Sequence, residues 1–242
     1  MTADFWVEEL REQLRAVGDE ERAVGAKAYL KSDFEFIGVA AKPLRMVARS
    51  FLAEHPEIGR DALLELVQGL WQQPVFELKA VAVALLERRM RSLETADLNL
   101  VEELLRRSHT WALVDWLCTK VAAPLVQSDP KATTLILERW SIDDDFWLRR
   151  ASMLAQLPSL RSGGGDFDLF ASFAAGMVGE KEFFIRKAIG WVLRDVSKKR
   201  PQLAYEFLSE HIDEVSGLTL REGSKYLPEV QRDDLRCRYR DR

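Results

Sequence analysis

Apolar residues recur at intervals of three and four along almost the whole chain, and this periodicity limits the fold more than any other feature. It is clear in the segments DFWVEELREQLRAV (4–17), ERAVGAKAYLK (21–31) and PLRMVARSFLAE (43–54). Such spacing places the apolar residues on one face of an α-helix, whereas a half-buried strand alternates every second residue. Pro43 is expected at the first helical position, where its missing N–H is tolerated. Because signals for strands are almost absent, the chain is predicted to be all-α.

Short polar segments interrupt the helical pattern and mark the connections. They are SDPK (128–131), SIDDD (141–145) and KKRPQ (198–202). The glycine-rich segment SGGGD (162–166) is expected to form a flexible loop between two helices. The chain is therefore expected to consist of helices joined by brief connections.

Four of the expected helices align with one another without gaps. They start at Phe76, Trp111, Trp147 and Phe184, and these starts lie 35, 36 and 37 residues apart. Such a period, with a second helix between successive copies, is typical of a stacked helical solenoid and resembles short HEAT-type repeats. We therefore predict a right-handed superhelical solenoid of HEAT-like helical repeats with a concave groove. A generic helical bundle is the alternative.

The repeats are expected to form a single domain over residues 1–230. Residues 231–242 match no repeat and include the whole of the arginine-rich segment RDDLRCRYRDR. Chain ends without packing partners are usually poorly ordered. These residues are therefore expected to form a frayed, basic C-terminal tail.

The register of the four helices places one acidic residue where the other copies have alanine. Four residues after the opening aromatic stand Ala80, Asp115, Ala151 and Ala188. Asp115 lies in the mainly apolar stretch SHTWALVDWLCTK (108–120). An ionised carboxylate without a partner would cost several kcal/mol in such surroundings. Packing therefore does not explain the substitution, which indicates a role for the carboxylate.

Cations precede this position in three of the four copies, as Lys79, Arg150 and Lys187. If equivalent helices stack side by side, these cations and Asp115 form one row. Two structural alternatives stay open: the cations could form a solvated face, or Asp115 could simply form an ion pair with Arg150.

The aromatic residues divide into two groups. Phe76, Trp147 and Phe184 are expected in the core, because one aromatic per repeat fills the interior of a solenoid. Trp111 and Trp191 lie on the stripe that also carries the charges. For these two residues a core position and a functional position are equally compatible with the pattern.

The composition of the chain limits the kinds of function that we expect for it. The formal net charge of −4 weighs against a general nucleic-acid binder, although not against a basic stripe on one face. The 2 cysteines and 3 histidines show no metal-ligand spacing, so no metal is expected and a reducing cytosol fits. The start of the chain lacks the features of a secretory signal, and no apolar run reaches the roughly 18 residues of a membrane helix. We therefore expect a soluble, cytoplasmic protein without membrane contact.

Four segments together resemble the bacterial AlkD-type DNA alkylation repair glycosylases. They are FEFIGVAAKPLR (34–45), TWALVDW (110–116), DDFWLRRASML (144–154) and FFIRKAIGWVLRDVSKKRP (183–201). The resemblance implies a DNA glycosylase built of HEAT-like repeats that binds duplex DNA in its concave groove. It implies release of positively charged N3- and N7-alkylated purines without metal or cofactor. One copy of such a groove is enough, so a monomer is predicted.

Transferred one position at a time, the resemblance assigns the catalytic tryptophan and aspartate to Trp111 and Asp115. It assigns the groove arginine to Arg150, with Arg149 as the one-residue alternative. The second groove tryptophan corresponds to Trp191.

Further contacts to DNA are expected from a tyrosine and several cations. Tyr29, in the segment AYLKSDF, rests on the resemblance alone. The cations at plausible groove positions are Lys42, Arg45, Lys187 and Arg194. Such side chains bind the phosphate backbone without reading the base sequence.

The residue types suit the implied chemistry. A cationic alkylpurine leaves as a neutral base, so the enzyme needs no general acid for the leaving group, and one carboxylate can serve the sugar. Asp115 is predicted to stay ionised, to stabilise the oxocarbenium-like sugar and to position a water. Trp111 and Trp191 would offer π faces to the cationic nucleotide. Two alternatives stay open: a non-catalytic sensor of DNA damage, and a HEAT-repeat adaptor that binds a protein.

Overall fold

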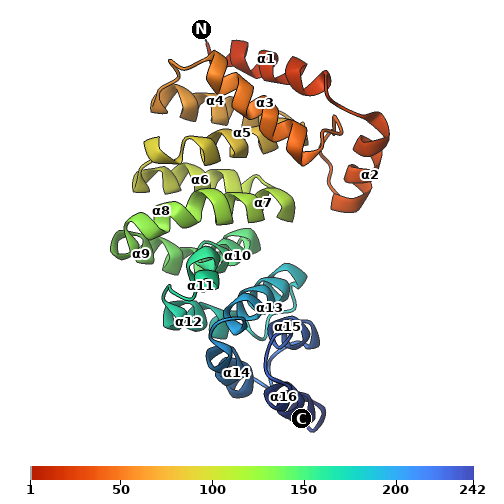
Figure 1. Cartoon of the computed structure of the whole chain (residues 1–242), viewed down its shortest axis with the longest axis vertical. Helices are drawn as coiled ribbons and strands as arrows, with labels where there is room; N and C mark the ends of the chain where they lie inside the picture. Colours follow the sequence, from red (N-terminus) through yellow and green to blue (C-terminus); the bar gives the residue numbers. More distant parts are fainter. Residues whose placement is uncertain (1) are drawn as a thin grey trace. The chain divides into compact units, whose positions relative to one another are not determined.

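The computed structural model describes residues 2–242, which are helical almost throughout (Figure 1). Within these residues the only strand-like pairing is one parallel bridge between Glu35 and Val75. The all-α prediction is confirmed. The chain divides into two compact units, Met1–Val121 and Ala122–Arg242. A single repeat domain over residues 1–230, with its handedness and concave groove, stays a prediction.

The first unit stacks its helices in sequence order, with α2 projecting at one side (Figure 1). Helices α1, α3, α4 and α5 pack together, and α5 also packs against α7. Two short 3-10 segments, η1 (Met90–Ser92) and η2 (Thr95–Asp97), precede α6. The helices are α1 (Ala3–Arg15), α2 (Glu20–Leu30), α3 (Ala41–Glu54), α4 (Arg60–Gln72), α5 (Phe76–Arg88), α6 (Leu98–Arg106) and α7 (Trp111–Leu117).

The second unit is built around α13, which packs against α10, α11, α14 and α15. Its helices are α8 (Ala123–Ser128), α9 (Pro130–Ser141), α10 (Phe146–Leu154), α11 (Leu157–Ser162), α12 (Phe167–Met177), α13 (Phe183–Ser197), α14 (Pro201–Glu210), α15 (Gly217–Gly223) and α16 (Glu229–Arg240). The central position of α13 is reflected in its burial, since most of its residues from Ile185 to Ser197 are inaccessible to solvent.

The polar segments found in the sequence begin helices as well as ending them. Asp129, Asp145 and Asp166 cap α9, α10 and α12 by accepting hydrogen bonds from backbone N–H groups at 3.0, 2.9 and 2.9 Å. Such caps satisfy donors that have no partner inside the helix. Pro201 opens α14. The SGGGD segment ends α11 and connects it to α12, as expected.

One helix start differs from the prediction. Helix α3 begins at Ala41, so Pro43 is its third residue and not its first. The N–H groups of the whole first turn lack partners inside the helix. Proline is therefore tolerated two residues further into the helix than predicted.

Equivalent helices lie side by side within each unit, as the repeat predicted. Helix α5 packs against α7, and α10 packs against α13. Trp147 is buried as expected, and its ring centroid lies 4.8 Å from that of Phe184. Phe76 and Phe184 are only half-buried, and Phe76 stacks on Phe36 at 5.0 Å. The opening aromatics thus pack against other aromatics, although only one of the three lies fully in the core.

The C-terminal residues 231–242 were expected to fray, and this expectation is wrong. Most of them belong to α16, which packs against α14. Leu235 is fully buried, and the Tyr205 hydroxyl donates to the Asp234 carboxylate at 2.8 Å. A single apolar residue and a few polar contacts therefore suffice to fix this basic helix, although its sequence matches no repeat.

A π-helical turn, η3 (Cys118–Ala122), follows α7. Pro124 stands two residues after this turn and has no N–H to donate to the carbonyl of Lys120, four residues earlier. A π-helical turn bonds five residues apart and accommodates this missing donor. The proline thus explains a local change of helix type directly after the predicted catalytic segment.

The side chain of Glu77 holds the loop between α2 and α3 in place through hydrogen bonds. Its buried carboxylate accepts hydrogen bonds from the N–H groups of Ile37, Gly38 and Val39 at 2.9, 2.8 and 3.2 Å. Gly38 has a φ of 83°, and a Cβ there would lie 1.9 Å from the carbonyl oxygen of Asp19. The loop therefore reaches the start of α2 closely enough to hold that helix, which has no buried residue of its own.

Replacing Glu77 by glutamine should lower the free energy of unfolding by about 2–3 kcal/mol, because an amide leaves buried N–H donors without acceptors. Urea denaturation followed by circular dichroism measures the change. The control Glu65→Gln, on the exposed face of α4, should stay within about 0.5 kcal/mol of the wild type. Equal stability of the two variants would contradict the assigned role of Glu77.

Candidate functional site

Helix α7 presents Trp111 and Asp115 on its half-exposed face. His109 takes a φ of 48° and Thr110 is extended, so the chain turns sharply before α7 begins at Trp111. Asp115 follows four residues later, and residues at this spacing share one face of a helix. The other faces of α7 are fully buried through Leu113, Val114 and Leu117.

Asp115 differs from its equivalents in exposure as well as in residue type. Ala80, Ala151 and Ala188 are all buried at the corresponding positions. Asp115 is half-buried, and its backbone carbonyl accepts a hydrogen bond from the Thr119 hydroxyl at 2.7 Å. The repeat that contains the carboxylate is therefore also the repeat in which this position reaches the surface.

Tyr29 lies next to Trp111. The two rings meet edge to face, with centroids 5.9 Å apart and planes at 82°. Tyr29 is 73% exposed, which is unusual for a large aromatic side chain. Its helix, α2, has no buried residues. Two residues that were assigned separately from the sequence are thus in contact in the first unit.

A second cluster surrounds Trp116, the neighbour of Asp115 in sequence. The guanidinium of Arg45 lies 4.5 Å from the centroid of the Trp116 ring. Glu87 accepts hydrogen bonds from the Arg45 guanidinium at 2.7 Å and from the Trp116 indole N–H at 2.9 Å. Lys42 is exposed on the same helix as Arg45. Arg45, predicted to contact DNA, thus also stacks on an indole and pairs with a carboxylate.

Lys79 is a buried cation and not part of a solvated face. Its ammonium group donates to the backbone carbonyl of Trp71 and lies 5.0 Å from the ring centroid of Phe34. Burial lowers the pKa of Lys79 to about 8, and the positive charge of Arg107 adds to this shift. Because the ammonium points into the first unit, Lys79 does not join a surface row of cations.

In the second unit, Arg149 and Arg150 are held by internal partners. The Arg149 guanidinium forms two hydrogen bonds of 3.0 Å with the Glu180 carboxylate and further bonds with the backbone carbonyls that precede α10. Arg150 is only 2% exposed, and its guanidinium donates to the carbonyl of Phe184. The alternative of a solvated face is therefore wrong for Arg150 as well as for Lys79.

Lys187 and Arg194 both reach Glu222 on α15. The Glu222 carboxylate accepts hydrogen bonds from Lys187 at 2.7 Å and from Arg194 at 2.5 Å. The hydrogen bond from Lys187 is the main reason why the pKa of Glu222 is lowered. Gly190 permits this close approach, because a Cβ there would lie 2.7 Å from the Cβ of Glu222. The two predicted DNA cations therefore share one acidic partner within the second unit.

Asp195 holds Trp191 in place. The indole N–H of Trp191 donates to the buried Asp195 carboxylate at 3.2 Å, and Arg161 and Lys198 donate to it at 2.8 and 2.6 Å. Burial raises the pKa of Asp195, but the hydrogen bonds from Lys198 and Arg161 outweigh it and leave the pKa below its ordinary value. Trp191 itself is half-buried, so its ring is fixed at one edge and partly open to solvent.

The acidic partners that sequence reasoning missed include Glu77, Glu87, Asp195 and Glu222. Asp195 could have been found, because it stands four residues after Trp191 on one helical face. The other three are joined to residues 28 to 42 positions away in the chain. Nothing in their local sequence indicates those partners.

The described residues also set limits on other kinds of site. Between residues 2 and 242 no group of three or more histidine, cysteine, aspartate or glutamate side chains is arranged to hold a metal ion. None of the helices in this range combines the length and hydropathy that crossing a bilayer requires.

The stacked helix pairs define an all-α protein of HEAT-like helical repeats. Residues 10–227 match the family of DNA alkylation repair enzymes, and the chain belongs to this family. Membership of this family implies that the protein binds DNA. No curated protein matches the chain.

Solved structures show the same fold. A protein from Enterococcus faecalis, described as a predicted DNA alkylation repair enzyme, is 27% identical with a TM-score of 0.80, over 88% of this chain and 97% of that one. The protein smu.31 from Streptococcus mutans UA159 is 18% identical with a TM-score of 0.60, over 77% of this chain and 92% of that one. AlkD2 from Streptococcus mutans is 18% identical with a TM-score of 0.59, over 85% of this chain and 99% of that one.

Replacing Asp195 by asparagine should lower the free energy of unfolding at pH 7 by about 2 kcal/mol, because charge-assisted hydrogen bonds are lost. A carboxyl whose pKa is lowered in the folded state stabilises the protein above its unfolded pKa and loses this effect in acid. The deficit should therefore shrink below a pH of about 4. Urea denaturation between pH 3 and 7 tests this, with Asp213→Asn, at an exposed carboxylate, as control. A deficit that stays constant down to pH 3 would contradict the assigned charge of Asp195.

Proposed function

We propose that this protein is a DNA glycosylase of base-excision repair. It hydrolyses the N-glycosidic bond of cationic N3- and N7-alkylated purines in duplex DNA. Asp115 stabilises the oxocarbenium-like sugar and positions the attacking water. We expect the enzyme to be monofunctional and to need no metal or cofactor.

The observation that carries the proposal is the placement of Asp115. It is a half-exposed carboxylate four residues from Trp111, at a helix position where the equivalent residues are buried alanines. A carboxylate that served only packing would be replaced by a small apolar residue, as it is in the other repeats. The edge-to-face contact of Tyr29 with Trp111 adds a second aromatic ring beside the same helix.

The chemistry follows from the charge of the substrate. The alkylated base carries a positive charge and leaves as a neutral molecule, so protonation of the leaving group is unnecessary. Positive charge then builds up on the sugar, where a nearby carboxylate stabilises the transition state and orients a water. Asp115 is the residue that supplies this negative charge.

Aromatic rings account for selectivity towards charged lesions. Trp111 and Tyr29 in the first unit, and Trp191 in the second, present partly exposed rings. A cation over an aromatic face gains about 0.5–2 kcal/mol, the higher value applying where water is excluded. Neutral lesions gain neither this interaction nor the attraction of a carboxylate, so they should be poor substrates.

Replacing Asp115 by asparagine should lower the rate of excision about 100-fold or more, because the side chain keeps its size but loses its charge. Affinity for the duplex should change little. Release of free methylpurine from methylated DNA is measured under single-turnover conditions, and binding is measured separately. The control variant Asp61→Asn on α4, at a solvent-exposed carboxylate, should release methylpurine at a rate within twofold of the wild-type rate.

The same assay separates the proposed enzyme from the other functions. Binding of methylated duplex without release of base by the wild type would indicate a damage sensor. Neither binding nor release would indicate a protein-binding adaptor. Excision by Asp115→Asn at the wild-type rate would remove Asp115 from the mechanism.

Binding to undamaged duplex should weaken steeply with salt. Cations that contact phosphates release counterions, and each contact contributes about 0.9 to the slope of log K against log salt. Titrations between about 50 and 200 mM salt measure that slope. An affinity that does not change over this range would contradict electrostatic binding of the backbone.

A further inference from the structure

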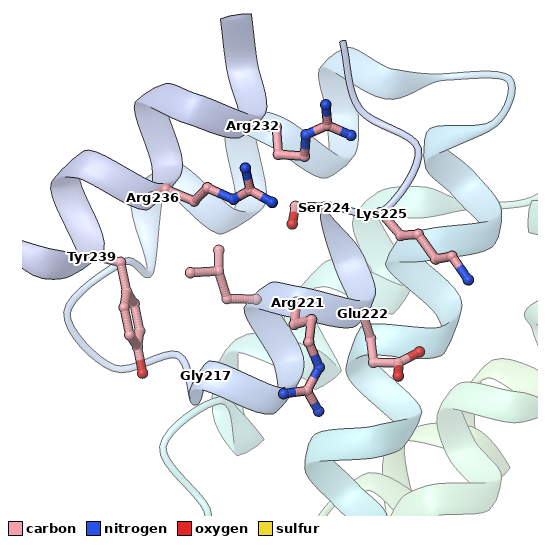
Figure 2. A pocket seen from close by; sticks show the side chains of 9 residues that line it. Gly217, Arg221, Glu222, Ser224, Lys225, Arg232, Arg236 and Tyr239 are labelled. Atoms are coloured by element: carbon pink, nitrogen blue, oxygen red, sulfur yellow. The ribbon is translucent and has the colours of Figure 1, made fainter. Parts of the chain in front are cut away.

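A pocket of about 600 Å³ opens between α15 and α16 in the second unit (Figure 2). This volume lies in the range of sites that bind small molecules or parts of larger ligands. Its walls come from the C-terminal basic helix and from α15 with the turn that follows it. The polar and aromatic residues on these walls are Arg221, Glu222, Ser224, Lys225, Arg232, Arg236 and Tyr239.

The pocket carries a large excess of positive charge. Four cationic residues line it, Arg221, Lys225, Arg232 and Arg236, together with one acidic residue, Glu222. That carboxylate is already bonded to Lys187 and Arg194 from α13. The charge of Arg221 also acts on this carboxylate. Glu222 is thus shared among several cations and leaves the pocket with a net positive charge, which would attract an anion from outside the chain.

Helix periodicity explains why these cations converge. Arg232, Arg236 and Tyr239 are spaced by four and three residues, so they form one stripe of α16. A different face of the helix is occupied by the packing against α14, through Leu235 and the bond between Tyr205 and Asp234. Figure 2 shows Arg236 extending along the gap between the helices towards Ser224, with Tyr239 at one end and Lys225 at the other.

The arginines of this stripe have unused hydrogen-bond donors. The Nε atom of Arg232 is buried and forms no hydrogen bond with any of residues 2–242. Arg236 has a carboxylate partner in Asp233 at 3.2 Å, but both side chains of this pair are more than half exposed, and such pairs contribute little. A guanidinium presents several N–H donors in a fork that matches phosphate oxygens.

The end of α16 is fixed in place, so the stripe does not depend on a loose terminus. Arg242 lies 3.7 Å from the centroid of the Tyr239 ring and donates to the backbone carbonyls of Ile212, Asp213 and Val215. These contacts tie the C-terminal residue to the segment that leads into α15. Both walls of the pocket are therefore anchored within the second unit.

We propose that this pocket binds a phosphate group of a DNA strand, with Arg232 and Arg236 as its principal donors. Lys225 and Arg221 add positive charge at its walls. The choice of DNA as the source of the phosphate rests on the proposed function. The pocket itself takes no part in the chemistry at the base, so its contribution appears in binding and not in the rate of bond cleavage.

The test measures binding of undamaged duplex by fluorescence anisotropy at several salt concentrations. Arg232→Gln, Arg236→Gln and the double variant are compared with the wild-type chain. The double variant should bind about tenfold more weakly, and its slope of log K against log salt should fall by about 1.8, the value for two lost contacts. Circular dichroism verifies that each variant is folded.

The matched control is Arg238→Gln on the same helix. Arg238 is exposed and donates to the carbonyl of Ser209, and it does not line the pocket. Its substitution removes the same charge, so binding within twofold of the wild type is expected. Equal weakening by Arg238→Gln and Arg236→Gln would overturn the proposal, because net charge alone would then explain the effect.

Calorimetric titration with inorganic phosphate distinguishes the source of the ligand. If the double variant loses phosphate binding while its affinity for duplex is unchanged, the pocket serves a free phosphate compound and the proposal is overturned. Unchanged binding of both ligands also overturns it. Weaker duplex binding by the double variant supports the pocket even where the wild type releases no methylpurine, since that result would count only against the glycosylase.

Discussion

Stacked helices place charged side chains in the interior, and each of those charges needs a partner. An unpaired ion inside a protein costs several kcal/mol, whereas a paired and hydrogen-bonded one is tolerated. Arg150 meets the carbonyl of Phe184, Lys79 meets that of Trp71, and Asp195 meets two cations and an indole. The need for partners explains why cations on the aligned helices of the repeats are held by the protein itself.

Asp115 stands out against this arrangement because its position reaches the surface while the equivalent alanines do not. A carboxylate that reaches the surface is accessible to a substrate. Hydrogen bonds to other residues of the first unit hold the segments that carry the neighbouring aromatic residues. Glu77 fastens the loop that holds the Tyr29 helix, and Glu87 binds the indole of Trp116. The first unit thus presents its carboxylate and rings in a preorganised form, which is what stabilisation of a transition state requires.

The fold was predictable because it depends on patterns that recur along the chain. The spacing of apolar residues and the near-constant distance between repeat aromatics predicted helices and their side-by-side packing within each unit. The assignment of Pro43 to the first helical position was off by two residues, since any position in the first turn accepts proline. The C-terminal helix was missed because one buried residue, Leu235, anchors it, and a single apolar position leaves no periodic signal.

The candidate site was predictable only in part. Asp115 was singled out because it broke a register of alanines, and Tyr29, proposed through resemblance alone, lies beside Trp111. The partners of the predicted cations were not found, because Glu87 and Glu222 reach them from other repeats. Whether an arginine is exposed or bonded to a distant carboxylate depends on tertiary packing, which short-range patterns do not encode.

If Asp115 stabilises positive charge on the sugar, the protein should bind a positively charged sugar mimic tightly. Duplex DNA containing a cationic aza-sugar in place of the damaged nucleotide imitates the oxocarbenium-like state, and a neutral tetrahydrofuran residue serves as its uncharged counterpart. We expect the wild type to prefer the cationic duplex by about 100-fold and Asp115→Asn to lose most of this preference. An equal preference in the two proteins would contradict this role of Asp115.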